Sequence, residues 1–153
     1  MNEEQMVEEL LAYIEGHLKD ELTLEEIEQK MGYSRFYLIR LFSQQTNYTI
    51  HKYIQMRRLT EAARDLVRTK LRIVDIAYEA NYDSQQAFTL AFKKVYHVSP
   101  SAYRQRGIFE PAMEPFHKVL LQQEDATLKV TSILKKQSSC TNRSYFRCMG
   151  VAA

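Results

Sequence analysis

Apolar residues recur at three- and four-residue steps through much of the first hundred positions, which is the period of an amphipathic helix. The pattern predicts a first helix over residues 6–18, whose apolar stripe is Met6, Val7, Leu10, Leu11, Ile14 and Leu18. A longer helix is predicted from the capping residue Thr49 to about Arg68, because this stretch is periodic and has no internal glycine or proline. Its expected buried positions are Ile50, Tyr53, Ile54, Ala62, Ala63, Leu66 and Val67.

Between these helices the sequence predicts two shorter helices and a tight turn. Thr23 and Glu26 have the spacing of a capping box, and Gly32 is the expected end of the helix that they begin. Ser34 is the expected cap of the next helix, only one residue after Tyr33. In that helix Leu38, Leu41 and Phe42 are predicted to face inward.

This pair of short helices occurs twice. "KMGYSRFYLIRLF" (30–42) is followed by the similar "EANYDSQQAFTLAF" (79–92). At an offset of 49, the residues Ile73, Ile76, Ala80, Asn81 and Tyr82 match Leu24, Ile27, Met31, Gly32 and Tyr33. After one inserted residue, Asp83, the offset is 50, and Ser84, Phe88, Phe92 and Tyr103 match Ser34, Leu38, Phe42 and Tyr53. Ser99 and Pro100 then supply a cap and a first-turn proline for a last helix.

Two short helices joined by a tight turn, the second with a polar and basic outer face, are typical of a helix-turn-helix, whose second helix enters the major groove of DNA. The connecting helix of about twenty residues would be roughly 30 Å long at 1.5 Å per residue. Successive major-groove entries on one face of B-DNA lie roughly 34 Å apart. One polypeptide would therefore contact two adjacent groove segments, and we expect a monomer on an asymmetric site rather than a dimer.

The composition and the hydrophobic pattern of the sequence change after about Arg106. "RGIFEPAMEPF" contains a glycine and two prolines and is typical of a linker, whereas "DATLKVTSILKK" alternates and predicts a strand. We therefore expect an all-α DNA-binding domain over residues 1–107 and a linker with a short extension over 108–153. So short an extension must dock, pair with another copy or stay loose. Cys140 and Cys148 fit neither a zinc pattern nor a disulfide scaffold.

Charge is distributed unevenly along the chain. The net charge of +2 is the sum of −8 over residues 1–33 (two bases, ten acids), +7 over 34–105 (twelve bases, five acids) and +3 over 106–153 (seven bases, four acids). This separation predicts one surface that repels polyanions and another that attracts them. The chain has no run of eighteen apolar residues, and its N-terminus is acidic, so we expect a cytoplasmic protein without a membrane span or a signal peptide.

Catalysis is not indicated. The four histidines are scattered, no serine or cysteine lies in a nucleophile motif, and glycine is too scarce for a phosphate-binding loop. We therefore expect no enzymatic activity, no metal and no cofactor.

The order of these elements resembles that of the AraC/XylS family of bacterial transcription activators. The likeness covers residues 5–105 and includes "LTLEEIEQKMGYS", "YIQMRRLTEAARDL" and the specific pattern "Y.S...F...FK......P..YR" from Tyr82 to Arg104. The resemblance implies a seven-helix domain that binds double-stranded promoter DNA and recruits RNA polymerase. It also implies base contacts from Arg35, Phe36, Ile39 and Arg40 in the first unit and from Gln85, Gln86, Thr89 and Leu90 in the second.

Each of these residues has an alternative interpretation. Arg40 has the chemistry to donate two hydrogen bonds to a guanine edge, but a phosphate contact or a solvated charge would also explain it. Arg35, near the helix start, favours phosphate. Phe36 either packs on a thymine methyl or is a partly buried core residue, and the glutamines suit adenine. The expected backbone contacts are Ser34, Tyr37, Gln44, Lys52, Arg57, Arg58, Ser84, Lys93 and Lys94, and a solvated surface position is the alternative for each.

Four positions depart from the family pattern. The family usually has glycine where this chain has Asn47 and His97, two residue types that tolerate left-handed backbone, so we expect both turns to survive. Arg72 replaces a small hydroxyl cap, and Leu90 replaces a basic residue found in several relatives, which predicts weaker base reading by the second unit. The segment after Phe109 weakly resembles the start of an effector-binding domain. The alternative function is therefore a regulator whose extension senses a ligand or protein, or mediates oligomerisation.

Overall fold

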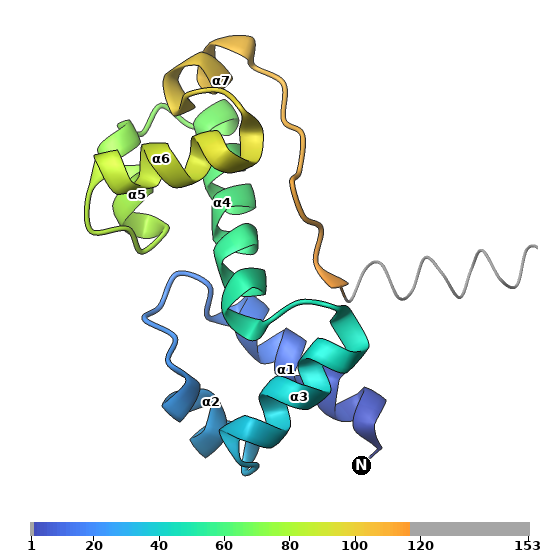
Figure 1. Cartoon of the computed structure of the whole chain (residues 1–153). Coiled ribbons are helices and arrows are strands. Elements are labelled where there is room, and N and C mark those ends of the chain that lie inside the picture. Colours follow the sequence, from blue (N-terminus) through green and yellow to red (C-terminus); the bar gives the residue numbers. More distant parts are fainter. Residues whose placement is uncertain (1, 117–153) are drawn as a thin grey trace, which may run out of the picture. The chain divides into compact units, whose positions relative to one another are not determined.

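Helix α1 (Glu3–Gly16) begins three residues before the predicted start, because Asn2 and Gln5 form a capping box at its first turn. The computed structural model describes residues 2–116, and the elements in this part of the chain are all helices, as predicted (Figure 1). They are α1 (Glu3–Gly16), α2 (Leu24–Met31), α3 (Arg35–Thr46), α4 (Ile50–Arg68), α5 (Ile73–Glu79), α6 (Gln85–Tyr96) and α7 (Pro100–Arg106). The predicted strand and both cysteines lie outside the described residues.

The predicted caps are present. The Thr23 hydroxyl accepts from the Glu26 amide at 3.2 Å, while the Glu26 carboxylate accepts from the Thr23 amide at 2.9 Å. Four further hydroxyl caps each accept from the amide three residues on: Ser34, Thr49, Ser84 and Ser99. Arg72 precedes α5 and makes no side-chain cap bond, as its replacement of a hydroxyl residue predicts. The helix boundaries are thus encoded locally.

Left-handed residues close the tight turns. Gly32 has φ of 71°, and the expected turns at Asn47 and His97 are formed with φ of 58° and 60°. Asn81 also has a positive φ, 59°, at the position that corresponds to Gly32 in the repeat. Asparagine and histidine accept this conformation better than most residues, so the departures from glycine leave the chain path intact.

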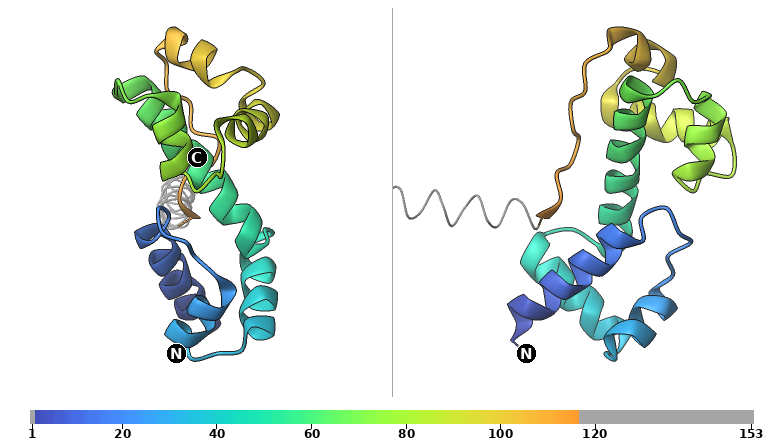
Figure 2. Two further views of the ribbon diagram at one scale, coloured as in Figure 1. Left: turned by 90° about the vertical axis from the view of Figure 1, so that its left-hand side faces the viewer. Right: turned by 180° about the vertical axis from the view of Figure 1, so that it is seen from behind.

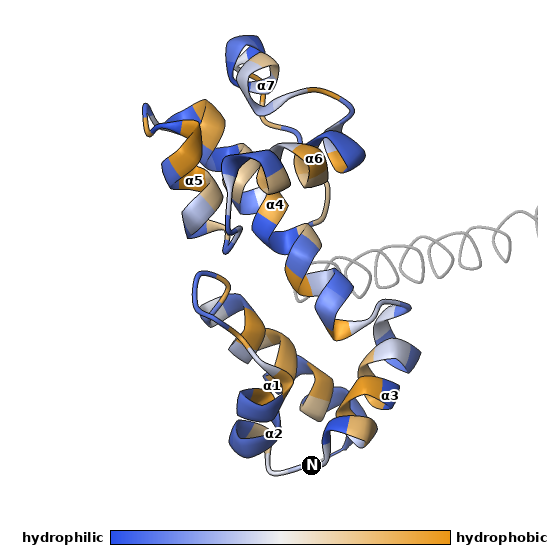
Figure 3. Ribbon diagram, turned by 60° about the vertical axis from the view of Figure 1, so that its left-hand side comes forward, coloured by the Kyte–Doolittle hydropathy of each residue, from blue (hydrophilic) through white to orange (hydrophobic). Residues whose placement is uncertain are grey.

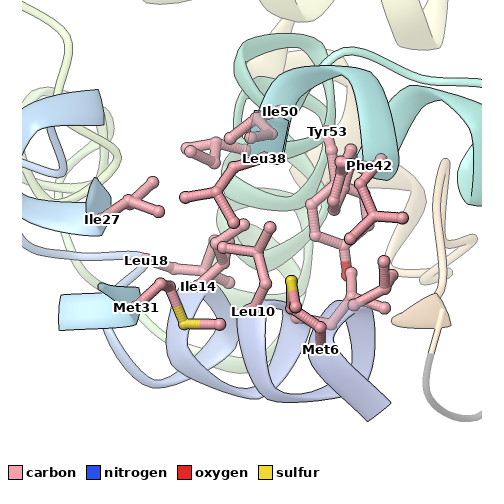
Figure 4. Packing of buried hydrophobic residues seen from close by; sticks show 14 residues of the cluster. Met6, Leu10, Ile14, Leu18, Ile27, Met31, Leu38, Phe42, Ile50 and Tyr53 are labelled. Carbon is pink, nitrogen blue, oxygen red and sulfur yellow. The ribbon is translucent and has the colours of Figure 1, made fainter. Parts of the chain in front are cut away.

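Helix α4 contributes to two separate cores (Figure 3). Its N-terminal half supplies Ile50, Tyr53 and Ile54 to a first core with residues of α1, α2 and α3 (Figure 4). Its C-terminal half supplies Leu59, Ala62, Ala63 and Leu66 to a second core with α5, α6 and α7. Val67, predicted to be buried, is only partly so, whereas Leu59 and Thr60 are buried without having been predicted.

The repeat is visible in the packing of aromatic rings. Phe42 lies edge-on to Tyr53 with ring centres 5.6 Å apart, and Phe92 lies edge-on to Tyr103 at 5.3 Å. These pairs occupy matching positions of the two halves. The tandem helix-turn-helix arrangement inferred from the sequence is therefore present, with α2–α3 and α5–α6 as its two units.

Residues 109–116 follow α4 from the second core to the first (Figure 2). The Tyr103 hydroxyl donates to the Glu110 carbonyl at 3.1 Å and accepts from the Glu110 amide at 2.8 Å. The Met113 amide donates to the Thr60 hydroxyl at 3.2 Å, and Phe116 packs 5.6 Å from the ring of Tyr53. This segment therefore belongs to the same compact unit as the seven helices.

Within the described residues, no helix is both long enough and apolar enough to cross a membrane.

Candidate nucleic-acid interface

The outer face of α3 carries the first set of predicted base contacts. Its inner positions Leu38, Leu41 and Phe42 are buried, which leaves the opposite side of the helix to solvent. Phe36 is 80% exposed, so the alternative that it is a core residue does not hold. Ile39 is half-buried and packs against the first core, which leaves it less surface than Phe36 to offer a base.

The two arginines of α3 lie in different electrostatic surroundings. Arg35 Nη1 donates to Glu25 Oε1 at 2.7 Å, and its Nε lies 3.8 Å from Glu28 Oε2, so α2 partly neutralises this side chain. Arg40 is exposed, and its guanidinium carbon lies 5.8 Å from the ring centre of Tyr37. Arg40 makes no ion pair with any residue that the structure describes. Its guanidinium is therefore available to donate to DNA.

Helix α6 presents the second set. Gln85, Gln86 and Leu90 are exposed, Thr89 is half-buried, and Phe88 and Phe92 fix the inner face in the second core. Leu90 is 65% exposed, so packing in the second core does not require a leucine at this position. The four predicted residues thus share one side of the helix, and their base contacts stay predictions.

Two of the predicted phosphate-binding lysines meet at one surface depression. It has a volume of about 310 Å³, lies between α4 and α6, and is lined by Lys52, Gln55, Leu59, Ala87, Leu90, Ala91, Lys94 and Val95. Both lysines are exposed, and they come from the two halves of the repeat. Two ammonium groups at one concave surface favour the approach of a polyanion.

Gln55 is a candidate that the sequence analysis missed. It lines the same depression one helical turn after Lys52, on the face that also carries Leu59. The spacing of three residues was visible in the sequence. This spacing alone does not indicate a binding residue, because a glutamine on a long helix is ordinarily solvated. Only the position of α6 beside α4 makes Gln55 a candidate.

Arg57, predicted to contact the DNA backbone, is buried instead. Its side chain is 3% exposed, and Nε and Nη2 donate to Glu15 at 2.8 and 2.9 Å. Nη2 also donates to Glu61 at 2.9 Å, and Nη1 donates to the Met113 carbonyl at 3.0 Å. Burial opposes its charge, but the hydrogen bonds to Glu15 and the charges of Glu15 and Glu61 together outweigh burial and raise the pKa of Arg57. The prediction of a phosphate contact is wrong for this residue.

Arg58 also has internal partners. Its Nε and Nη2 donate to the carbonyls of Leu18 and Asp20, each at 2.7 Å, and its side chain is half-buried. Burial lowers the pKa of Arg58. These two bonds use Nε and one proton of Nη2, so Nη1 still has donors to offer and the phosphate contact of Arg58 stays a prediction.

The remaining predicted backbone contacts occupy suitable positions. Lys93 and Lys94 lie exposed in the last turn of α6, and Gln44 is exposed on α3. Tyr37 is half-buried and packs against the first core. The hydroxyls of Ser34 and Ser84 accept cap bonds from the amides of Tyr37 and Ala87, which leaves each O–H free to donate. Helix N-termini of this kind suit phosphate.

Known proteins with the same organisation match this chain over the described domain. A family model described as a helix-turn-helix domain matches residues 27–106. The transcriptional activator AarP of Providencia stuartii is 40% identical over 99 residues, which cover 65% of this chain and 73% of AarP. The regulatory protein SoxS of Escherichia coli is 38% identical over 106 residues, covering 69% of this chain and 99% of SoxS.

Solved structures agree with these matches. The C-terminal domain of AraT, a response regulator from Geobacillus stearothermophilus, superposes with a TM-score of 0.63 at 32% identity, covering 71% of this chain and 91% of that one. The shared part contains both helix-turn-helix units and the helix that connects them. Because sequence, family model and fold coincide over this part, the chain belongs to the AraC/XylS family of DNA-binding transcription regulators.

Proposed function

We propose that this regulator binds an asymmetric promoter site as a monomer, with α3 and α6 in adjacent segments of the major groove, and activates transcription from it. The observation that carries the proposal is the part that α4 takes in both cores. One helix of 19 residues, about 28 Å long, supports both recognition helices. This length is close to the roughly 34 Å that separates successive groove entries on one face of the duplex.

Base reading is assigned mainly to the first unit. Arg40 is exposed and makes no ion pair within residues 2–116, which suits bidentate donation to guanine. Phe36 offers an apolar surface to a thymine methyl. In the second unit, Gln85 and Gln86 suit adenine, while Leu90 has no hydrogen-bonding group. Lys52, Lys93 and Lys94 supply phosphate contacts that fix the register and carry no sequence information.

Activation is proposed from two observations. The relative AarP is named a transcriptional activator, and the solvent-facing sides of α1 and α2 are acidic, with Glu3, Glu4, Glu8, Glu9, Glu25 and Glu26 all exposed. Such a surface repels the duplex and suits a basic protein partner. We assign this partner role to RNA polymerase.

The test begins with fragments that the full chain selects from genomic DNA, followed by footprinting. Protection of two adjacent groove segments without two-fold symmetry is expected, and protection of a single segment would contradict the two-groove arrangement. Arg40→Ala should then lower the affinity for a selected duplex by about 1–3 kcal/mol while leaving binding to bulk DNA nearly unchanged. Arg68→Ala, at an exposed position in the last turn of α4, is the matched control. An equal loss of affinity for every duplex would show that Arg40 contacts a phosphate and not a base.

We also propose a regulatory role for the chain that follows the domain. Residues 109–116 support it, because they connect that chain to both cores through Phe109, Met113 and Phe116. A signal received by residues 117–153 would thus reach the connecting helix directly. Promoter affinity and mass in solution, measured with and without residues 117–153, decide the matter. Unchanged values would leave the extension without a regulatory function.

A further inference from the structure

The loop between α1 and α2 (residues 17–23) contacts the second helix-turn-helix unit. Asn81 Nδ2 donates to the carbonyls of Lys19 and Asp20 at 3.1 and 2.7 Å. Lys19 Nζ lies 2.7 Å from Glu79 Oε2. The two units share α4 and are both contacted by residues 109–116, and this loop joins them at a further place away from the axis of α4.

Arg58 reinforces this contact from α4. Its two bonds, to the carbonyls of Leu18 and Asp20, hold the same loop, so the Asp20 carbonyl accepts from both Arg58 and Asn81. A small open depression between the loop, α4 and α5 has a volume of about 20 Å³, room for roughly one water molecule. The contact is closely packed and rich in hydrogen bonds.

The identity of residue 81 is not explained by its turn. Asn81 has φ of 59°, and the matching turn of the first unit is made by Gly32 with φ of 71° and without any side chain. Glycine adopts this conformation at no steric cost, so the turn itself does not require asparagine. What asparagine adds is an amide group that reaches the loop of the other unit.

A single helix such as α4 resists bending. The rotation of one unit relative to the other about the helix axis, however, depends on how each unit packs against its end of α4. Residues 109–116 follow α4 closely, whereas the loop contact lies to the side of α4 and opposes this rotation directly. We propose that Asn81 is a positioning residue that fixes the rotation of one recognition helix relative to the other, and so sets the spacing between the two half-sites that the protein accepts. The link from rotation to spacing rests on the proposed two-groove function.

The first experiment needs no DNA. Spin labels are placed on cysteines introduced at two exposed positions, Gln45 in α3 and Gln105 in α7, with Cys140 and Cys148 replaced by serine in the full chain. Double electron–electron resonance then measures the distribution of the distance between the labels. We expect a narrow distribution that becomes about twice as broad with Asn81→Gly. An unchanged width would overturn the proposal.

Asn47→Gly is the matched control. It makes the same replacement at a left-handed position with φ of 58°, but no side-chain hydrogen bond of Asn47 is found with any described residue. Both variants should melt close to the parent temperature, because glycine suits both backbones. Only the Asn81 variant should broaden the distribution. Glu79→Gln removes the ion pair to Lys19, which is a further polar contact between this loop and the second unit. Combined with Asn81→Gly, it should broaden the distance distribution further than Asn81→Gly alone.

The second experiment measures spacing. The probes are a duplex selected by the parent protein from a random library and the same duplex with one base pair inserted between its halves, which adds about 3.4 Å and rotates one half by about 35°. The parent should discriminate against the insertion, and Asn81→Gly should reduce that discrimination about fivefold, the effect of losing one or two hydrogen bonds.

The two experiments separate the two claims. A broadened label distribution with unchanged spacing discrimination would overturn the assignment of spacing to Asn81. If the parent itself ignores the insertion while the distribution broadens, the two-groove function fails and Asn81 keeps its role in orientation alone.

Discussion

Arg57 on α4 and Glu15 on α1 form a bidentate ion pair inside the molecule, with Nε and Nη2 at 2.8 and 2.9 Å from the two carboxylate oxygens. The Tyr53 hydroxyl donates to the same carboxylate at 2.6 Å, and burial together with this bond raises the pKa of Tyr53. The pair ties α1 to the connecting helix beside the Met113 carbonyl. It therefore supports the fold, and it leaves Arg57 almost no exposed surface.

Replacement of Arg57 by alanine should destabilise the domain by about 3 kcal/mol, because Glu15 loses its ion pair and keeps, among residues 2–116, only the Tyr53 hydroxyl, while the Met113 carbonyl loses its donor. Urea unfolding followed by circular dichroism measures the loss. Glu15 is 22% exposed, so water recovers part of its solvation and places the loss toward the lower end of the range for buried pairs. The salt dependence of DNA binding should stay that of the parent.

The double variant Glu15→Leu with Arg57→Met should recover much of that stability, since it removes both charges and keeps apolar volume. A single Arg57→Ala variant that unfolds like the parent but binds DNA with a shallower salt slope would restore the phosphate role that the structure rejects.

Leu90→Arg should strengthen DNA binding. Leu90 is 65% exposed on the outer face of α6, so the substitution places a guanidinium on the recognition helix without disturbing the core. Titrations between about 50 and 200 mM salt should show a slope steeper by about one counterion. Ile108→Arg is the control, because Ile108 has the same exposure but follows α7. An equal gain from both variants would mean that only net charge matters.

Arg72→Ser should stabilise the second unit. Arg72 has the backbone of a helix cap, with φ of −64° and ψ of 147°, yet its side chain makes no cap bond. A serine hydroxyl there is placed to accept from the Asp75 amide, as Thr23 accepts from the Glu26 amide in α2, and adds a second acceptor to the Arg72 carbonyl that this amide now contacts at 3.0 Å. The exposed ion pair with Asp75 that is lost contributes little.

The midpoint of urea unfolding is the measurement for this variant. Thr23→Ala, which deletes an existing cap, should lower the midpoint by the equivalent of about 1 kcal/mol and calibrates the effect. A midpoint for Arg72→Ser at or below that of the parent would show that the cap does not form.

Asp65→Asn should raise the melting temperature at neutral pH. Burial raises the pKa of Asp65, and the nearby Glu79 and Glu61 add to the effect of burial, while Lys19 and Arg64 oppose it. The folded state therefore holds the Asp65 proton more tightly than the unfolded chain does. The contribution of Asp65 to stability is fully present below its unfolded pKa of about 3.9 and is lost as the pH rises through its higher folded pKa. The neutral amide avoids this loss.

The gain from Asp65→Asn should therefore shrink as the pH is lowered toward about 4. Asp75→Asn is a control of opposite sign, because the hydrogen bonds from Arg72 lower the pKa of Asp75 and make its charge favourable at neutral pH. Melting curves of both variants across this range decide the prediction, and parallel behaviour of the two would contradict it.

The sequence by itself determined the helices, their caps, the left-handed turns and the duplication. Each of these depends on residues a few positions apart: a hydroxyl three residues before an amide, an apolar stripe of period 3.6, or a residue type that tolerates positive φ. The outward faces of α3 and α6 follow from the same periodicity. Phe36 was the one position on those faces whose burial the pattern left open, since only neighbouring elements decide it.

Tertiary structure alone decided what the charged residues of α4 do. Arg57 lies one turn after Tyr53 on the buried side of the helix, but its partner Glu15 is 42 residues away in the chain, and no local rule connects them. The amide of Asn81 likewise meets the carbonyls of a loop about 60 positions earlier. Periodicity assigns a residue to a face of its helix, whereas the neighbour that covers this face is set by how distant segments pack.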